Sequence, residues 1–174
     1  LWQHTLITLI EIGLGLLLGF IFGLSSALLL SFSPKTSSLL LPILVISQAI
    51  PVFAIAPILV LWLGYGMPSK ILMAILIIYF PVTAACYDGL RNTPQAWLDL
   101  AKTLKPSPLR LLLKVRLPAA LPAFASGFRI AVSVAPIGAV IGEWVGSSEG
   151  LGYLMIHANA RMQVDLMFAA LLIL

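Results

Sequence analysis

Two ionisable residues, Arg129 and Glu143, lie within apolar sequence and are the first candidates for chemistry. In a membrane, a charged side chain is costly unless it faces a protein interior or water. The two are 14 residues apart, about 21 Å along one helix, so they cannot pair with each other. We expect Arg129 near the inner membrane boundary. For Glu143, a role in gating a polar path or seating an external partner and a plain interhelical hydrogen bond both stay open.

Catalytic and metal chemistry have little support in the sequence. His4 and His157 lie in unrelated segments without a second histidine at ligand spacing, and neither a nucleophile elbow nor a P-loop is present. The single cysteine, Cys86, excludes an intramolecular disulfide and is expected to be a packing residue. We therefore expect no enzyme activity, no cofactor and no metal site in this chain.

The composition is that of a membrane protein. Hydrophobic residues make up 61% of the chain and charged residues 9%, with a mean hydropathy of +1.10. Long unbroken apolar runs such as Leu14 to Leu30 favour helices. The prediction is one all-α, polytopic membrane domain over residues 1–174 with about five spans. Because Met167 to Leu174 is too short to cross a bilayer, we expect a fragment that is incomplete at both ends, with a truncated last span.

The four full spans are expected at Thr5–Leu30, Leu39–Leu63, Lys70–Tyr87 and Ala119–Val145. The first carries a stripe of small residues at four-residue spacing, which allows close helix packing: Gly15, Gly19, Gly23 and Ala27.

The second span contains three prolines, each of which bends a helix and frees a carbonyl group: Pro42, Pro51 and Pro57. Ser47 and Gln48 lie one turn before Pro51, so Gln48 and Pro51 are candidates for a polar path through the membrane. An interhelical hydrogen bond of Gln48 without a substrate role is the open alternative.

The loop from Asp88 to Pro118 carries the whole net charge of the chain, with six basic and two acidic residues. Basic loops are retained in the cytoplasm, so this loop and the Ser31–Ser38 turn are placed inside. The Gly64–Ser69 turn and the Gly146–Asp165 segment are then outside. The positive-inside rule accounts for the charge, and no nucleic-acid partner is expected.

Two short amphipathic helices are predicted within this loop. Thr93 should cap the first, and Lys105-Pro106 should end it. Ser107-Pro108 should begin the second, and Pro118 should stop it. Their apolar faces are expected to consist of Trp97, Leu100, Ala101 and Leu104 in the first helix and Leu109, Leu112 and Leu113 in the second. Lipid headgroups, the protein's own spans and a partner could each cover these faces.

The loop resembles a known motif. Asp99-Leu100-Ala101, Lys105, Val115 and Leu117-Pro118 match the spacing of the EAA loop of binding-protein-dependent ABC permeases: Glu-Ala-Ala, three residues, Gly, nine residues, Ile, one residue, Leu-Pro. Two positions depart from that pattern. Leu100 replaces the first alanine, and Lys105 with Pro106 replaces the glycine corner.

The resemblance implies a type I ABC importer permease fold in a bacterial plasma membrane. It implies ATPase subunits that hold ATP and Mg, a second permease subunit forming a homodimer, an extracytoplasmic solute-binding protein and surrounding lipid. The ATPase interface that it implies consists of Asp99, Leu100, Ala101, Lys102, Leu104, Lys105, Pro106, Ser107, Val115, Leu117 and Pro118.

Further segments look like the branch that imports nitrate, sulfonates, taurine and pyrimidine precursors of thiamine. These are Pro51 to Gly64, Leu117 to Pro122, Ser126-Gly127 and Glu143 to Gly152. Ser47-Gln48 and the run Ile137 to Trp144 look closest to the pyrimidine-precursor members. A sulfonate or nitrate importer, an ion-coupled secondary transporter and a membrane scaffold stay open as alternatives.

Overall fold

The computed structural model describes the backbone of residues 1–174 and every side chain but that of Pro34. The described chain is helical throughout, without strands. Its elements are α1 (Trp2–Phe32), α2 (Pro34–Ser47), α3 (Val52–Leu63), α4 (Met67–Arg91), α5 (Gln95–Thr103), α6 (Pro108–Leu111), the π-helical turn η1 (Leu112–Arg116), α7 (Leu117–Gly146), α8 (Leu151–Ala160) and α9 (Val164–Ile173).

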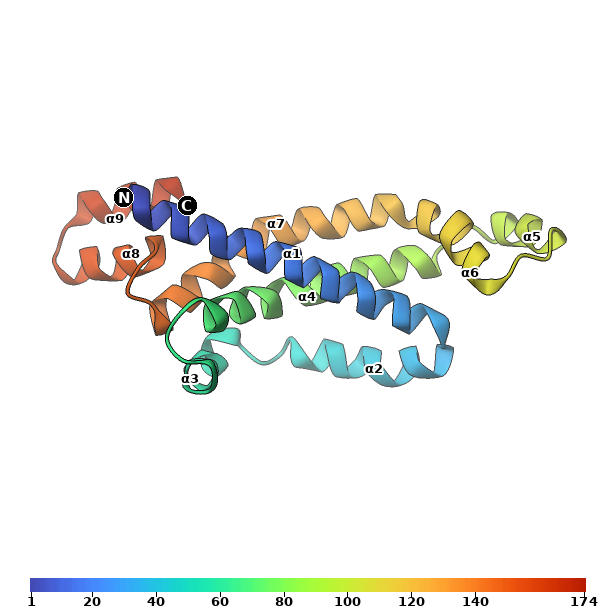
Figure 1. Ribbon diagram of the computed structural model, residues 1–174, viewed down its shortest axis with the longest axis horizontal. Coiled ribbons are helices and arrows are strands. Elements are labelled where there is room, and N and C mark those ends of the chain that lie inside the picture. Colours follow the sequence, from blue (N-terminus) through green and yellow to red (C-terminus); the bar gives the residue numbers. More distant parts are fainter.

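Three long helices form the body of the molecule, with α4 packed against both α1 and α7 (Figure 1). The core between them includes Ala74, Ile78 and Val82 of α4 and Ala131 and Ala135 of α7, all fully buried. At one end lie α5 and α6, and at the other lie α8, α9 and both chain termini. We call these the loop end and the α8 end.

The small-residue stripe of α1 packs closely against another helix, as predicted, and that helix is α4. A Cβ added at Gly15 would lie 2.6 Å from Ala74 Cβ, and one at Gly19 would lie 2.8 Å from Ile78 Cγ2. Larger side chains would force the two helices apart, since interiors are packed without spare volume. The glycines therefore set the spacing between α1 and α4.

The membrane-length helices agree with three of the four predicted full spans. α1, α4 and the continuous helix Pro108–Gly146 are each long and apolar enough to cross a bilayer. α9 is a shorter apolar helix of 10 residues, at the position of the predicted truncated span.

The single bent span predicted over Leu39–Leu63 is wrong in its middle. α2 and α3 are separate helices, bent by 95° relative to each other, and only together do they reach the length of a span. The last turn of α2 tightens through bonds from Gln48 N to Val45 O and from Ile50 N to Ser47 O. Pro51 then stands in extended conformation, with φ −63° and ψ 123°, and cannot donate to a continuing helix.

The predicted Ser31–Ser38 turn is much shorter in the structure. α1 continues to Phe32, and Ser33 is the residue between α1 and α2, with φ −137° and ψ 114°. Ser33 Oγ accepts a hydrogen bond from Thr36 N at 3.3 Å and so caps α2. A serine cap therefore replaces the predicted polar loop.

Pro118 does not stop the second loop helix, contrary to the prediction. A helix runs without a break from Pro108 to Gly146, and Pro118 lies in the first turn of α7. The preceding turn η1 is a π-helix, whose wider backbone leaves room for a proline ring that would clash in a regular α-helix.

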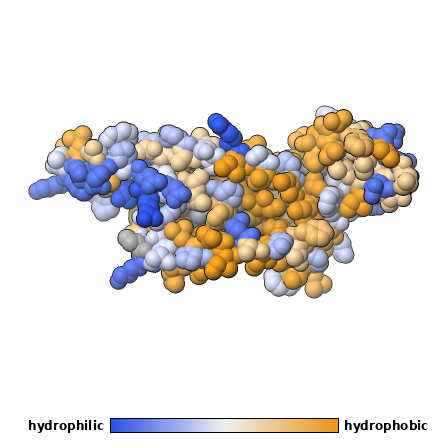
Figure 2. Space-filling view, turned by 180° about the vertical axis from the view of Figure 1, so that it is seen from behind, coloured by the Kyte–Doolittle hydropathy of each residue, from blue (hydrophilic) through white to orange (hydrophobic). Residues whose placement is uncertain are grey.

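Surface hydropathy follows the helix arrangement. Figure 2 shows the molecule from behind, with hydrophilic residues gathered over the loop end and hydrophobic residues over much of the middle. α1 exposes large apolar side chains on its outer face, among them Leu17, Phe22 and Leu29. An apolar surface of this extent around membrane-length helices is suited to lipid.

Candidate functional site

Helix α5 begins one residue later than predicted. Its N-cap is Pro94, without a side-chain cap bond. Thr93 is not the cap: it is buried, and its Oγ1 donates to Leu90 O at 3.1 Å, which ties the loop to the end of α4. The prediction failed because the Thr93 hydroxyl bonds back to α4 and makes no cap bond to α5.

Asp99 lies on the exposed face of α5 with its side chain 59% exposed. Its Oδ1 accepts hydrogen bonds from Lys102 Nζ at 2.9 Å and from Gln95 Nε2 at 3.0 Å. The Lys102 hydrogen bond, followed by that of Gln95, lowers the pKa of Asp99 below its ordinary value. Asp99 is therefore an ionised, positioned carboxylate on the surface.

The apolar stripe predicted for α5 is divided between two faces. Leu100 and Leu104 are strongly exposed, at 69% and 81%, and Trp97 is exposed as well. Ala101 is buried instead, on the helix that lies against η1. Of the predicted ATPase-interface residues, Ala101 therefore packs within this chain, whereas Leu100 and Leu104 are exposed.

Lys105 forms the corner between α5 and α6 and has a left-handed backbone, with φ 46°. This is the position where the EAA pattern has glycine, the residue best suited to positive φ. Pro106 follows, and Ser107 Oγ then accepts from Arg110 N at 3.4 Å as the cap of α6. The corner thus keeps its shape with a lysine in it.

The remaining predicted interface residues are Lys102, before this corner, and Val115, Leu117 and Pro118, after it. Lys102 is exposed beside Asp99. Val115, in η1, and Leu117, at the start of α7, are half-buried, and Pro118 is exposed. Val115 and Leu117 thus partly pack into the chain, so the surface offered outward consists mainly of the α5 residues and the corner.

A hollow of about 520 Å³ opens where α2 and α3 separate. It is lined by Ser47, Gln48, Ile50, Pro51, Val52, Phe53, Ile55, Leu76, Ile77, Tyr79 and Ile141. Two of the three predicted path residues, Gln48 and Pro51, are in this lining. Tyr79 supplies a further polar group, and its Oη donates to Ser26 Oγ at 2.8 Å.

Glu143, the third predicted path residue, lies elsewhere, buried at the α8 end with 1% exposure. Its Oε1 accepts from Thr8 Oγ1 at 2.5 Å, and its Oε2 accepts from the backbone N–H groups of Gly152 and Tyr153. A carboxylate at a helix N-terminus satisfies free amide groups and complements the helix dipole. Glu143 thus joins α1, α7 and α8, whereas Arg129 is exposed on α7.

Two side chains of α1, His4 and the already named Thr8, complete the same junction. The backbone N–H of Gly150 donates to His4 Nδ1, and that of Leu151 donates to Thr8 Oγ1, both at 2.9 Å. Each amide group of the first turn of α8 therefore has a side-chain acceptor. The attachment of the turn at Gly150 to Gly152 to α1 was not predicted from the sequence.

A buried ion pair lies beside this junction and was missed by the sequence analysis. Lys70, at the start of α4, pairs with Glu11 of α1, and its Nζ also donates to Ser147 Oγ at 3.0 Å. Both charged side chains are almost fully buried. A signal was available: His4, Thr8 and Glu11 extend the stripe of Gly15 and Gly19 toward the N-terminus, so they face the same neighbouring helices.

Membrane-length helices, a broken helix pair with a hollow at the break, and a basic loop of short helices define the membrane-spanning subunit of a transport system. The chain belongs to the family of binding-protein-dependent transport system inner membrane components, which matches residues 15–174. It is thus the permease component of an ABC importer and a multi-pass inner-membrane protein. Partners of the family in general are an ATPase and a binding protein.

The relatives agree with this assignment. The chain is 87% identical over its whole length to a probable ABC transporter permease protein of Haemophilus influenzae, covering 71% of that protein. It is 39% identical over 99% of its length to the formylaminopyrimidine transport permease protein ThiX of Halalkalibacterium halodurans, covering 69% of it.

A third named relative and a solved structure extend the comparison. The chain is 31% identical over its whole length to the taurine transport system permease protein TauC of Escherichia coli, covering 63% of it. The inward-facing MetNI methionine ABC transporter has a similar fold, with a TM-score of 0.78 at 19% identity. That match covers 99% of this chain and 90% of the other, and it supports the type I importer permease fold expected from the sequence.

Proposed function

We propose that this permease passes an uncharged polar solute of the hydroxymethylpyrimidine type, a thiamine precursor, through the hollow between α2 and α3. One observation carries the proposal: the described lining of the hollow combines hydroxyl groups and one amide with apolar side chains and includes no charged residue. The hydroxyl groups belong to Ser47 and Tyr79, and the amide belongs to Gln48.

An anionic solute fits this lining poorly. A sulfonate or nitrate ion taken out of water loses several kcal/mol of hydration unless a cation or several donors replace the water. Lys70, a cation buried in the span region, is already paired with Glu11. A heterocycle with ring nitrogens and a hydroxymethyl group needs a few hydrogen bonds and a flat apolar wall, which Gln48, Tyr79 and Phe53 supply.

Similarity in sequence supports the same substrate class. The 39% identical relative is named for formylaminopyrimidine transport, and the taurine relative is less similar, at 31%. A separate binding protein would also select the solute. The hollow would then need only to accept the solute that this protein delivers.

We propose that a separate ATPase, which holds ATP and Mg, powers transport and docks on the loop end. We place the loop end in the cytoplasm because of its positive charge. The docking surface would consist of Asp99, Leu100, Lys102 and Leu104 with the corner at Lys105. On docking, the two exposed leucines would bury apolar surface against the ATPase, and the Asp99 carboxylate would add one directional polar contact. Two copies of this chain would enclose the path.

Uptake into proteoliposomes tests the substrate. The complete transporter, with its ATPase and binding protein, should accumulate labelled hydroxymethylpyrimidine when ATP is present and should not accumulate labelled taurine. Gln48→Leu should slow pyrimidine uptake. Gln3→Leu, which removes an exposed amide of α1 outside the hollow, should leave it unchanged. Taurine uptake without pyrimidine uptake would contradict the proposed substrate, and uptake driven by an ion gradient alone would contradict the ATP-driven mechanism.

Association with the ATPase tests the docking surface separately. Asp99→Lys should abolish copurification of the ATPase while the variant still inserts into the membrane, because a cation replaces the carboxylate. Asp165→Lys makes the same charge change on an exposed residue of α9 and should leave copurification intact. Equal copurification of both variants would remove Asp99 from the interface.

A further inference from the structure

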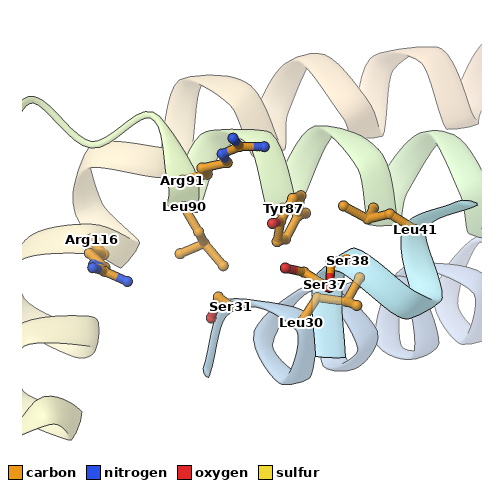
Figure 3. Close-up of a pocket in the computed structure, with 9 residues that line it drawn as sticks. All are labelled: Leu30, Ser31, Ser37, Ser38, Leu41, Tyr87, Leu90, Arg91 and Arg116. Atoms are coloured by element: carbon orange, nitrogen blue, oxygen red, sulfur yellow. The ribbon is translucent and has the colours of Figure 1, made fainter. Parts of the chain in front are cut away.

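A second hollow, of about 430 Å³, lies at the loop end of the helix bundle. Figure 3 shows its lining: Leu30 and Ser31 at the end of α1, Ser37, Ser38 and Leu41 of α2, Tyr87, Leu90 and Arg91 of α4, and Arg116 of η1. The ends of α1 and α4, the first half of α2 and the η1 turn therefore meet around one cavity. This hollow is distinct from the proposed substrate path, whose lining it does not share.

Two arginines give the hollow a positive charge. Arg91 is exposed and Arg116 is half-buried. In the described part of the chain, the ion pairs are those of Lys70 and Lys102, so neither arginine has an acidic partner there. Arg116 Nε is buried and lacks a hydrogen-bond partner among the described atoms. A buried donor left without an acceptor is costly, so Arg116 Nε is a donor that a ligand in the hollow could satisfy.

The hydroxyl groups add one further free donor. Ser31 Oγ donates to Leu28 O and Ser38 Oγ to Lys35 O, within their own helices. Tyr87 is largely buried beside them, and its hydroxyl is available to a ligand. Leu30 and Leu90 are buried in the apolar wall of the hollow. The lining thus presents two guanidinium groups and a phenol above an apolar wall.

We propose that this hollow binds the phosphate group of an anionic phospholipid. Guanidinium groups match the geometry of phosphate oxygens, and basic pockets between membrane helices bind anionic headgroups. Phe32, Leu39 and Leu40 are exposed next to the hollow, where acyl chains of the same lipid would lie. An acidic segment of a protein partner would use the arginines but would leave this apolar surface uncovered.

The test is lipid binding to the purified chain in dodecyl maltoside, followed by native mass spectrometry. Short-chain phosphatidylglycerol should bind more tightly than phosphatidylcholine of the same chain length. The double variant Arg91→Gln/Arg116→Gln should lose this preference, by about 25-fold if each cation near an anionic headgroup contributes about fivefold. Tyr87→Phe, which removes one hydroxyl group and keeps the ring, should weaken phosphatidylglycerol binding by less than the double arginine variant does.

The control is Arg110→Gln/Arg161→Gln, which removes the same charge from two exposed arginines outside the hollow and should keep the preference. If this control lost the preference for phosphatidylglycerol to the same extent, the preference would depend only on the net charge of the protein, and the proposed site would be overturned. Glycerol phosphate binding as tightly as the lipid would assign the site to a free phosphate compound. Loss of bound lipid on addition of the ATPase subunit would assign it to a protein partner. Either result would overturn the lipid proposal.

Discussion

Gly150 lies directly against the carboxyl group of Glu143: a Cβ added at Gly150 would overlap Glu143 Cδ. Gly150 also has a backbone φ of +112°, a conformation that residues other than glycine rarely adopt. Glu143 in turn accepts hydrogen bonds from the first amide groups of α8. The close approach of these two residues therefore fixes how α8 attaches to the end of α7.

Substitution of Gly150 should be far more damaging than substitution of another glycine at positive φ. Gly64 has φ +80°, and a Cβ there meets no atom within 4 Å. Gly64→Ala should therefore cost only backbone strain, about 1 to 3 kcal/mol, whereas Gly150→Ala should cost about 1 to 3 kcal/mol more because of the overlap. Thermal unfolding in detergent measures both. Equal melting temperatures would contradict the close packing of Glu143 on Gly150.

Removing Lys70 should destabilise the protein because its partner, Glu11, would stay buried without compensation. Lys70→Met is expected to cost about 3 to 5 kcal/mol, the usual effect of breaking a buried ion pair. The double variant Lys70→Met/Glu11→Gln should recover much of this loss, since both charges are gone. Denaturant unfolding of the two single variants and the double variant measures the coupling. Additive losses would show that the two side chains act independently.

Lys105→Gly should stabilise the corner between α5 and α6. A left-handed backbone costs a residue with a Cβ roughly 1 kcal/mol, and glycine avoids this cost. Lys102→Gly, three residues earlier inside α5, should instead lower the stability by about 1 kcal/mol through its poor helix propensity. Hydrogen exchange of the loop amides detects both changes. Faster exchange in both variants would mean that Lys105 is not strained.

The carboxyl group of Asp99 should titrate below its ordinary pKa of 3.8. The lowered pKa means that folding favours the ionised form, so the contribution of Asp99 to stability is present above pH 3.8 and is lost as the pH falls through the pKa of the folded state. Carbon NMR of labelled aspartate measures the midpoint. Lys102→Met should raise it, because Lys102 supplies the strongest hydrogen bond. The same midpoint in both proteins would rule out that cause.

Much of the fold could be predicted because apolar length is a local property of sequence. The helices α1, α4 and α7 and the small-residue stripe of α1 agree with the prediction within a few residues. The break between α2 and α3 could not be derived in this way. Pro42 and Pro57 stay inside helices, whereas Pro51 begins a new one. Which proline breaks a helix depends on the surroundings that satisfy the freed backbone groups.

The candidate sites were likewise predictable only where the signal lies within one short segment. The motif spacing located α5 and the corner at Lys105, because that pattern is contained in one short segment. It could not reveal that Ala101 turns inward, since that depends on where α5 rests against η1. Thr8 and Glu143 are 135 residues apart, and nothing in the sequence selects one as the partner of the other. The spacing of His4, Thr8 and Glu11 indicated which face of α1 they share, but it did not indicate which residues they contact there.

The unbroken helix from Pro108 to Gly146 also has a mechanical consequence. Its 39 residues would extend about 58 Å if straight, so α6 and Glu143 lie on one continuous helical rod. A tilt imposed at α6 is carried along this rod to Glu143 and, through the amide groups that Glu143 holds, to α8. The π turn at Leu112–Arg116 and the interior prolines Pro122 and Pro136 are irregular points of the rod, and their flexibility sets how much of that tilt arrives at the opposite end.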